Sequence, residues 1–123
     1  MKQTEINFDI LGIKEEKFQG ITTGFVGKDG GHYDNAWDAV WIGTFNFCGC
    51  GDTDYELERF ANVLHLTESG GLANIQKDMQ IYLYLLDAYG FTEHGFSIYS
   101  SFLTEKGKVL LRIVNKEIED SKL

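Results

Sequence analysis

The N-terminal part of the chain contains two stretches with the pattern of β-strands. Residues 5–10 place three apolar side chains on one parity, which is the alternation of a half-buried strand. Residues 18–26 are rich in β-branched and aromatic side chains and end at Gly27. We therefore predict two strands that form a hairpin across residues 12–17.

A glycine-rich loop and a third strand are expected next. Residues 28–35 combine Gly, Asp and Asn, which adopt the left-handed conformations that turns require, and His32 lies within this loop. In residues 37–47 aromatic side chains occupy one parity and aliphatic ones the other, as in a strand buried on both faces. Its two tryptophans are four residues apart, so helical spacing would also bring them together.

Helical spacing of apolar residues begins after the third strand. Asp52 or Thr53 is a good N-cap for a first helix, which ends at residues 69–71. A second helix is predicted over about residues 72–89, with Gly90 as its C′ residue. The side chains expected to face the core are Leu57, Phe60, Ala61 and Leu64 in the first helix, and Ile75, Met79, Tyr82, Leu83 and Leu86 in the second.

The C-terminal part is predicted to contain a β segment and a last helix. Residues 91–103 have the composition of a strand or hairpin, and Thr104 can cap a helix that buries Val109, Leu110, Ile113 and Val114. The chain therefore predicts one α+β domain over residues 1–123, with N-terminal antiparallel strands and three helices. The final helix, β segment and helix resemble the tail of winged-helix folds.

Charge narrows the functions that the chain can perform. The 123 residues carry 19 acidic and 11 basic side chains, a net charge of −8. Residues 29–93 hold eleven of the acids and only two of the bases. Binding to phosphate backbones needs clustered cations, so we expect no direct nucleic-acid binding. The acidic segment fits either a solvated face or a docking surface for a basic partner.

The distribution of apolar residues gives an expected location. No apolar run approaches the ~20 residues of a membrane span. Glu5 and Asp9 stand where a secretory signal would have its apolar stretch. We therefore expect a cytoplasmic protein that does not enter membranes.

Cys48-Gly49-Cys50-Gly51 is the strongest local chemical signal. Two thiolates one residue apart can face the same small volume, and thiolates are suitable ligands for Zn²⁺. A single pair leaves a tetrahedral site half built. The alternative is that both cysteines are small buried residues beside a turn.

Histidines could complete a structural zinc site. His94 follows the stop of the second helix in a polar turn, and His32 lies just before the strand that leads to the cysteines. His65 is placed roughly 18 Å along its helix from the cysteine turn, at ~1.5 Å per residue. We predict Zn²⁺ held by Cys48, Cys50, His94 and His32; His65, Asp52 or Glu93 are alternative fourth ligands.

Three motifs resemble small uncharacterised proteins encoded by bacteriophages and prophages. They are Phe47-Cys48-Gly49-Cys50-Gly51, residues 86–95 and residues 102–107, and the resemblance covers roughly residues 41–111. Small acidic phage proteins include inhibitors of host defence nucleases, anti-CRISPR proteins among them, and some of these bind metal. The resemblance thus implies a non-enzymatic inhibitor, with a type II CRISPR nuclease as the best guess for its partner.

The expected partner surface is acidic and contains one exposed tyrosine. An inhibitor of this kind would occupy a basic nucleic-acid groove as a DNA mimic, or dock on a domain that the nuclease must move. Tyr84 should lie off the buried face of its helix, where tyrosine suits either a protein interface or ordinary surface packing. The predicted partner-binding residues are Asp52, Asp54, Glu56, Glu58, Asp78, Tyr84 and Asp87.

Two other functions remain open from the sequence. A small zinc-dependent enzyme would use His94 and Glu93 at an open coordination position. A regulator of winged-helix type would bind nucleic acid, which the negative charge opposes.

Overall fold

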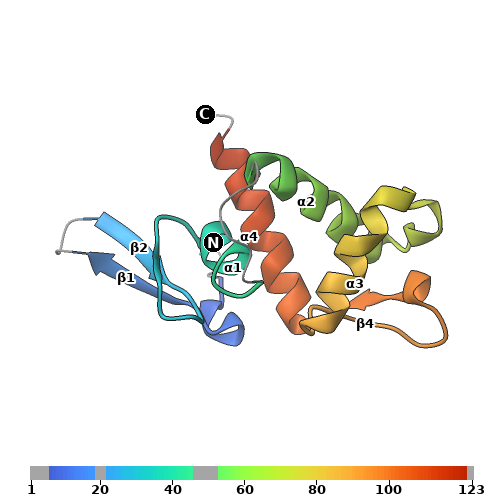
Figure 1. The fold of residues 1–123 in the computed structure, drawn as a ribbon, viewed down its shortest axis with the longest axis horizontal. Helices are drawn as coiled ribbons and strands as arrows, with labels where there is room; N and C mark the ends of the chain where they lie inside the picture. The colour runs from blue at the N-terminus through green and yellow to red at the C-terminus, as the bar shows by residue number, and fades with distance from the viewer. Residues whose placement is uncertain (1–5, 19–21, 46–52, 122–123) are drawn as a thin grey trace, which may run out of the picture. The chain divides into compact units, whose positions relative to one another are not determined.

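The computed structural model describes residues 6–18, 22–45 and 53–121. The chain divides into two compact units, Met1–Thr53 and Asp54–Leu123. Helices and antiparallel strands are both present, which confirms the α+β prediction (Figure 1). Among the described residues, no helix has both the length and the apolar character that a bilayer crossing requires.

The first unit contains a three-stranded antiparallel sheet. Its strands are β1 (Lys14–Phe18), β2 (Thr22–Val26) and β3 (His32–Tyr33), and they pair in that order. The prediction of a strand over residues 18–26 therefore holds for its second half. The hairpin predicted across residues 12–17 is wrong, because most of that segment is β1. This charged strand is exposed along residues 14–17, and its backbone pairing with β2 places it in the sheet.

The strand predicted over residues 5–10 is also wrong within residues 6–10, because this part of the chain leads into a 3₁₀ helix, η1 (Phe8–Leu11), and residue 5 lies outside the described residues. Gly12 ends this helix with a left-handed φ of 73°, and its N–H donates to the carbonyls of Asp9 and Phe8. The edge of the Phe8 ring meets Phe25 of β2, with 5.1 Å between centroids. Three alternating apolar residues were too short a pattern to outweigh this turn and its packing.

The third predicted strand is instead the short helix α1 (Ala36–Trp41). Asn35 caps it, because its Oδ1 accepts a 2.8 Å hydrogen bond from the Asp38 N–H. The helical turn stacks Trp37 on Trp41, with 5.6 Å between ring centroids. The cap at Asn35 and the stacking of the two tryptophans, which are four residues apart, favour a helix over the strand that the alternating pattern predicted. Residues 46 and 47 of the predicted strand lie outside the described residues.

Helix α2 (Thr53–Ser69) begins the second unit and matches its prediction. The four core positions predicted in it, Leu57, Phe60, Ala61 and Leu64, are all buried. Gly70 follows the helix with a left-handed φ of 80°, which glycine adopts without steric cost. The predicted helix end is therefore confirmed.

The second predicted helix is regular only in its second half. Residues 72–79 contain two 3₁₀ turns, η2 (Leu72–Asn74) and η3 (Lys77–Met79), and α3 spans Gln80–Ala88. Ile75 and Gln76 have extended backbone, which interrupts the helix between the two turns. The buried stripe is nevertheless as predicted at Ile75, Met79, Leu83 and Leu86, while Tyr82 is half-buried. Gly90 takes the predicted left-handed conformation after α3.

A two-stranded hairpin and the helix α4 (Glu105–Ser121) complete the second unit (Figure 1). Strand β4 (Thr92–Glu93) pairs antiparallel with β5 (Phe102–Leu103), and the 3₁₀ turn η4 (Ile98–Ser100) lies between them. The predicted hairpin is thus present. The Thr104 hydroxyl accepts from the Gly107 N–H at 3.2 Å, which confirms it as the N-terminal cap of α4. The four core positions predicted in α4 are buried.

The end of α3 is tied to the beginning of α4 by side chains. The Thr104 hydroxyl donates to the Gly90 carbonyl at 2.7 Å, and the Lys106 ammonium donates to the Tyr89 carbonyl at 2.9 Å. A cation near the last carbonyls of a helix also favours its dipole. These bonds join the two helix ends between which the hairpin lies in the sequence.

Candidate functional site

His94 is the predicted metal ligand whose surroundings the structure describes. It directly follows β4, and its Nδ1–H donates to Oδ1 of Asp87, on α3, at 3.0 Å. The Thr92 hydroxyl donates to the same oxygen at 3.5 Å. A carboxylate on Nδ1–H fixes the ring and leaves Nε2 as the free acceptor, as in carboxylate–histidine–zinc arrangements. A neutral His94 held in this way would keep Nε2 available to a metal.

The other predicted metal ligands are not brought together by the described structure. Cys48, Cys50 and Asp52 lie outside the described residues, and His32 is exposed on β3 of the first unit. His65 has a structural partner, because its Nε2 is 2.9 Å from Oδ1 of Asn115 on α4. Within residues 6–18, 22–45 and 53–121, no three acidic, histidine or cysteine side chains form a group suited to a metal. The zinc site therefore stays a prediction.

Some of the predicted partner-binding residues are exposed, some are paired with a neighbouring side chain, and the side chains of others are not described. Glu58 is exposed on α2, and Asp78 forms a 2.6 Å ion pair with Arg59. Tyr84 is exposed on α3, whereas Asp87 is engaged by His94. The side chains of Asp54 and Glu56, in the first turn of α2, are not among those that the structure describes.

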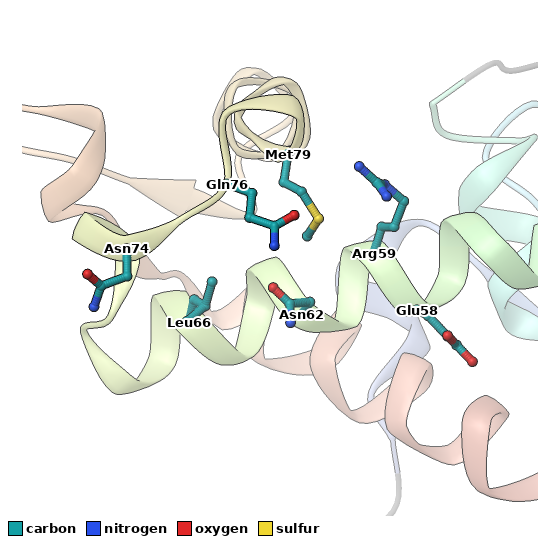
Figure 2. Close-up of a pocket in the computed structure, with 7 residues that line it drawn as sticks. All are labelled: Glu58, Arg59, Asn62, Leu66, Asn74, Gln76 and Met79. Carbon is teal, nitrogen blue, oxygen red and sulfur yellow. The ribbon is translucent and has the colours of Figure 1, made fainter.

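A groove runs between α2 and the segment that precedes α3 (Figure 2). Its volume is about 470 Å³. On α2, the lining residues Arg59, Asn62 and Leu66 are three and four positions apart, so they lie on one face of the helix. Gln76 and Met79 reach toward this face from the opposite segment in Figure 2. The lining residues are Glu58, Arg59, Asn62, Leu66, Asn74, Gln76 and Met79.

Exposed apolar side chains are concentrated on α3 and the hairpin. In the described chain, every large hydrophobic side chain classed as exposed falls within residues 81–102. We call this set the α3–hairpin surface; it consists of Ile81, Tyr84, Tyr89, Phe96, Tyr99 and Phe102. Phe96 is fully exposed, and Phe102 stands opposite exposed Glu93 in the hairpin register. Helix α3 packs on β4, which pairs with β5, so neighbouring elements carry this surface.

Asp29 and Tyr33 form a hydrogen-bonded pair in which the pKa values of both groups are shifted. The Tyr33 hydroxyl donates to Oδ2 of Asp29 at 2.6 Å, and the Gly31 N–H donates to Oδ1 at 3.0 Å. These bonds lower the pKa of Asp29, the tyrosine bond being the larger cause. The same bond to the carboxylate raises the pKa of Tyr33 to about 12. The pair fixes the loop between β2 and β3 and has a structural role.

Sequence reasoning identified only Tyr84 of the α3–hairpin surface, and it missed the groove. The available signal was the composition of α3, which has Ile81 and Tyr84 on the side opposite the buried Leu83 and Leu86. A helix that is apolar all round is either buried or is an interface. The groove could not be read from the sequence, because the extended residues Ile75 and Gln76 create its second wall.

No protein-family model, curated protein or solved structure matches this chain. Its function must therefore be argued from the surfaces described above.

Proposed function

We propose that this chain is a non-enzymatic binding protein that docks a partner protein through the α3–hairpin surface. The observation that carries the proposal is the concentration of exposed aromatic and aliphatic side chains within residues 81–102. Isolated exposed apolar residues are common, but a set of this size on adjoining elements is typical of an interaction site. Tyrosine and phenylalanine are also enriched at the centres of protein interfaces.

The charge around this surface selects the kind of partner. Glu93 is exposed opposite Phe102, and Asp78 is 66% exposed at the beginning of the segment that leads into α3. The chain as a whole has a net charge of −8. A second copy of the chain would bring like charges together, whereas a basic protein would be attracted. The partner is therefore a protein with basic residues around an apolar patch.

In its narrower form, the proposal makes the partner a nucleic-acid-binding nuclease of a bacterial host, specifically a type II CRISPR nuclease. Such enzymes need basic grooves for their nucleic acid, and an acidic protein competes for the same charges. The support for this form is charge complementarity, together with the resemblance to phage proteins.

The test is affinity capture with matched variants from a bacterial lysate. A protein retained by the wild-type chain should be lost with Phe96→Ser/Phe102→Ser, because these exposed rings would supply the apolar contact. Lys108→Ala, at an exposed position of α4, is the control and should retain it. Glu93→Lys should weaken binding of the purified partner about tenfold and reduce its sensitivity to salt. If the Phe96→Ser/Phe102→Ser variant captures the protein as well as Lys108→Ala does, the α3–hairpin surface is not the docking site.

A structural zinc ion is a separate part of the proposal, and its support is the orientation of His94 by Asp87. Elemental analysis of protein purified without added zinc should find about one equivalent. Cys48→Ser/Cys50→Ser should remove the metal and lower thermal stability. A metal-free wild-type protein with unchanged stability in a chelator would contradict this part alone.

A further inference from the structure

The exposed face of the β4–β5 hairpin places a carboxylate beside an aromatic ring. Glu93 of β4 is the register partner of Phe102 of β5. The neighbouring register pair, Thr92 and Leu103, is buried. Because successive side chains of a strand point to opposite faces, Glu93 and Phe102 share the face that is turned to solvent. Directly opposed residues of an antiparallel pair have their Cβ atoms about 5 Å apart, so one ligand can contact both side chains.

The same combination of groups holds an arginine elsewhere in this unit. The Arg59 guanidinium forms an ion pair with Asp78 at 2.6 Å, and its central carbon lies 5.6 Å from the centre of the Tyr82 ring. The Arg59 side chain is 18% exposed, although that of Asp78 is 66% exposed. A guanidinium is planar and weakly hydrated, so it can donate to a carboxylate and lie on an aromatic ring at the same time. A carboxylate beside a ring can thus draw an arginine side chain out of water.

The hairpin pair has no such cation from its own unit. Glu93 forms no ion pair with another described residue, and Phe102 makes no ring or cation–π contact with one. Glu93 is exposed, and Phe102 is 53% exposed. The net charge of −8 on the chain further favours a cationic ligand over an anionic one.

We infer that Glu93 and Phe102 form a site for an arginine side chain of the partner protein. The inference rests on the proposed function, because it takes the α3–hairpin surface as the docking face and names the residue that this part of the surface recognises. The guanidinium lies against the Phe102 ring and donates to the Glu93 carboxylate. A lysine would keep the ion pair, but its ammonium is more strongly hydrated and has no planar face to lie on the ring. The site therefore prefers arginine to lysine.

The experiment is an NMR titration of the isotopically labelled full chain with three peptides. They are acetyl-Gly-Arg-Leu-Arg-Gly-amide, the same peptide with both arginines replaced by lysine, and the same peptide with both replaced by citrulline, which is neutral and nearly the same shape. The arginine peptide should shift the backbone amide signal of Glu93 and the ring signals of Phe102. The other two should bind about fivefold more weakly. Equal response to the arginine and lysine peptides, or no response at millimolar concentration, would overturn the inference.

Variants assign the preference to the two side chains. Glu93→Gln should weaken the arginine peptide about fivefold and reduce the salt dependence of its binding. Phe102→Leu keeps an apolar side chain without the ring, so it should abolish the preference for arginine over lysine, whereas Phe102→Tyr should retain it. Glu119→Gln, at an exposed position near the other end of α4, is the control and should change nothing. Circular dichroism of each variant establishes that the fold is retained, and a full arginine preference in folded Phe102→Leu would overturn the inference.

This site and the proposed function can fail separately. If Phe96→Ser/Phe102→Ser loses the captured protein while the wild-type chain binds the arginine and lysine peptides equally, the docking surface stands and only the arginine site is wrong. If that double variant captures the protein as well as the wild type does, the docking surface is wrong, whichever peptide the wild-type chain prefers.

Discussion

The two units of the chain are stabilised in different ways. The second unit contains two helices of 17 residues and one of 9, and each buries an apolar stripe. The first unit has strands of at most five residues and a helix of six, and particular polar contacts fix them. The Tyr33 side chain, for example, lies so close to two glycines that an added Cβ would come to 2.8 Å from a ring carbon at Gly27 and to 2.8 Å from the hydroxyl oxygen at Gly31.

This difference shows where each unit is sensitive to change. A short helix forms too few backbone bonds to persist alone, so α1 depends on its cap and on the tryptophan stack. The long helices gain most of their stability from burial, and they are sensitive where backbones approach closely. Both tryptophans of the chain belong to the first unit, so their fluorescence reports that unit, while the helical circular dichroism signal is dominated by the second.

The largest effect is expected at Gly107, in the first turn of α4. A Cβ there would collide with the Phe91 carbonyl oxygen, a backbone atom that cannot move without displacing the hairpin. Gly107→Ala should destabilise the second unit by roughly 3 kcal/mol, as severe overpacking does. Denaturant unfolding followed by circular dichroism measures the loss. Gly95→Ala is the matched control, because nothing lies within 4 Å of its added Cβ, and comparable losses in the two variants would contradict the steric explanation.

A pair of cap variants should give an intermediate effect that separates the units. Asn35→Ala removes the cap of α1, and Thr104→Ala removes the cap of α4, each at a cost of about 1 kcal/mol. Asn35→Ala should shift the unfolding transition seen by tryptophan fluorescence, and Thr104→Ala the transition seen by circular dichroism. If each variant shifts both signals equally, the two units unfold as one cooperative structure and the contrast between them fails.

The smallest effect is expected from pH, and it is confined to the first unit. The pKa of Asp29 is lowered below its ordinary value of 3.8, so its contribution to stability is present above that pH and is lost as pH falls through the folded pKa. The pKa of Tyr33 is raised to about 12, so its contribution is complete below pH 10 and is lost as pH rises toward 12.

Tyr33→Phe tests this pH dependence. The variant should unfold more easily at neutral pH than the wild type does, and the loss of stability between pH 10 and 12 should be reduced in it, as measured by tryptophan fluorescence. Because the pair is exposed to solvent, the change should be modest. If Tyr33→Phe loses as much stability between pH 10 and 12 as the wild type does, groups other than Tyr33 cause that loss.

The second unit was largely predictable from its residues. Apolar spacing placed the buried side chains of α2 and α4, Gly70 and Gly90 marked helix ends, and Thr104 marked a beginning. These signals are local, because caps and left-handed glycines act within one turn. The break at Ile75 and Gln76 was missed, because no glycine or proline marks it and the buried stripe continues through it.

The first unit was predicted poorly because its elements are short. Alternation over a few residues fits a strand, a 3₁₀ turn or a short helix equally well, and contacts distant in sequence decide among them. The Phe8 ring meets β2, and Trp37 meets Trp41 only once Asn35 has started a helix. Strand β1 has no alternation, so only its pairing with β2 reveals it.

The candidate sites show the same division. His94 and Tyr84 could be selected from the sequence, because a polar turn after a helix stop and a tyrosine off the apolar stripe are local features. The engagement of His94 by Asp87 could not be selected, because it depends on how β4 folds back beside α3. The groove depends in the same way on the path of residues 74–79 past α2.

The sequence by itself determined the α+β class, the long helices with their ends, and an acidic middle segment. These properties follow from residue type and spacing along one stretch of chain, so they need no knowledge of distant neighbours. Apart from Tyr84, tertiary structure decided which apolar residues between 81 and 102 stay exposed, and it alone decided which carboxamides share a groove. Exposure and proximity are properties of packed surfaces, and packing joins residues whose separation in the sequence carries no signal.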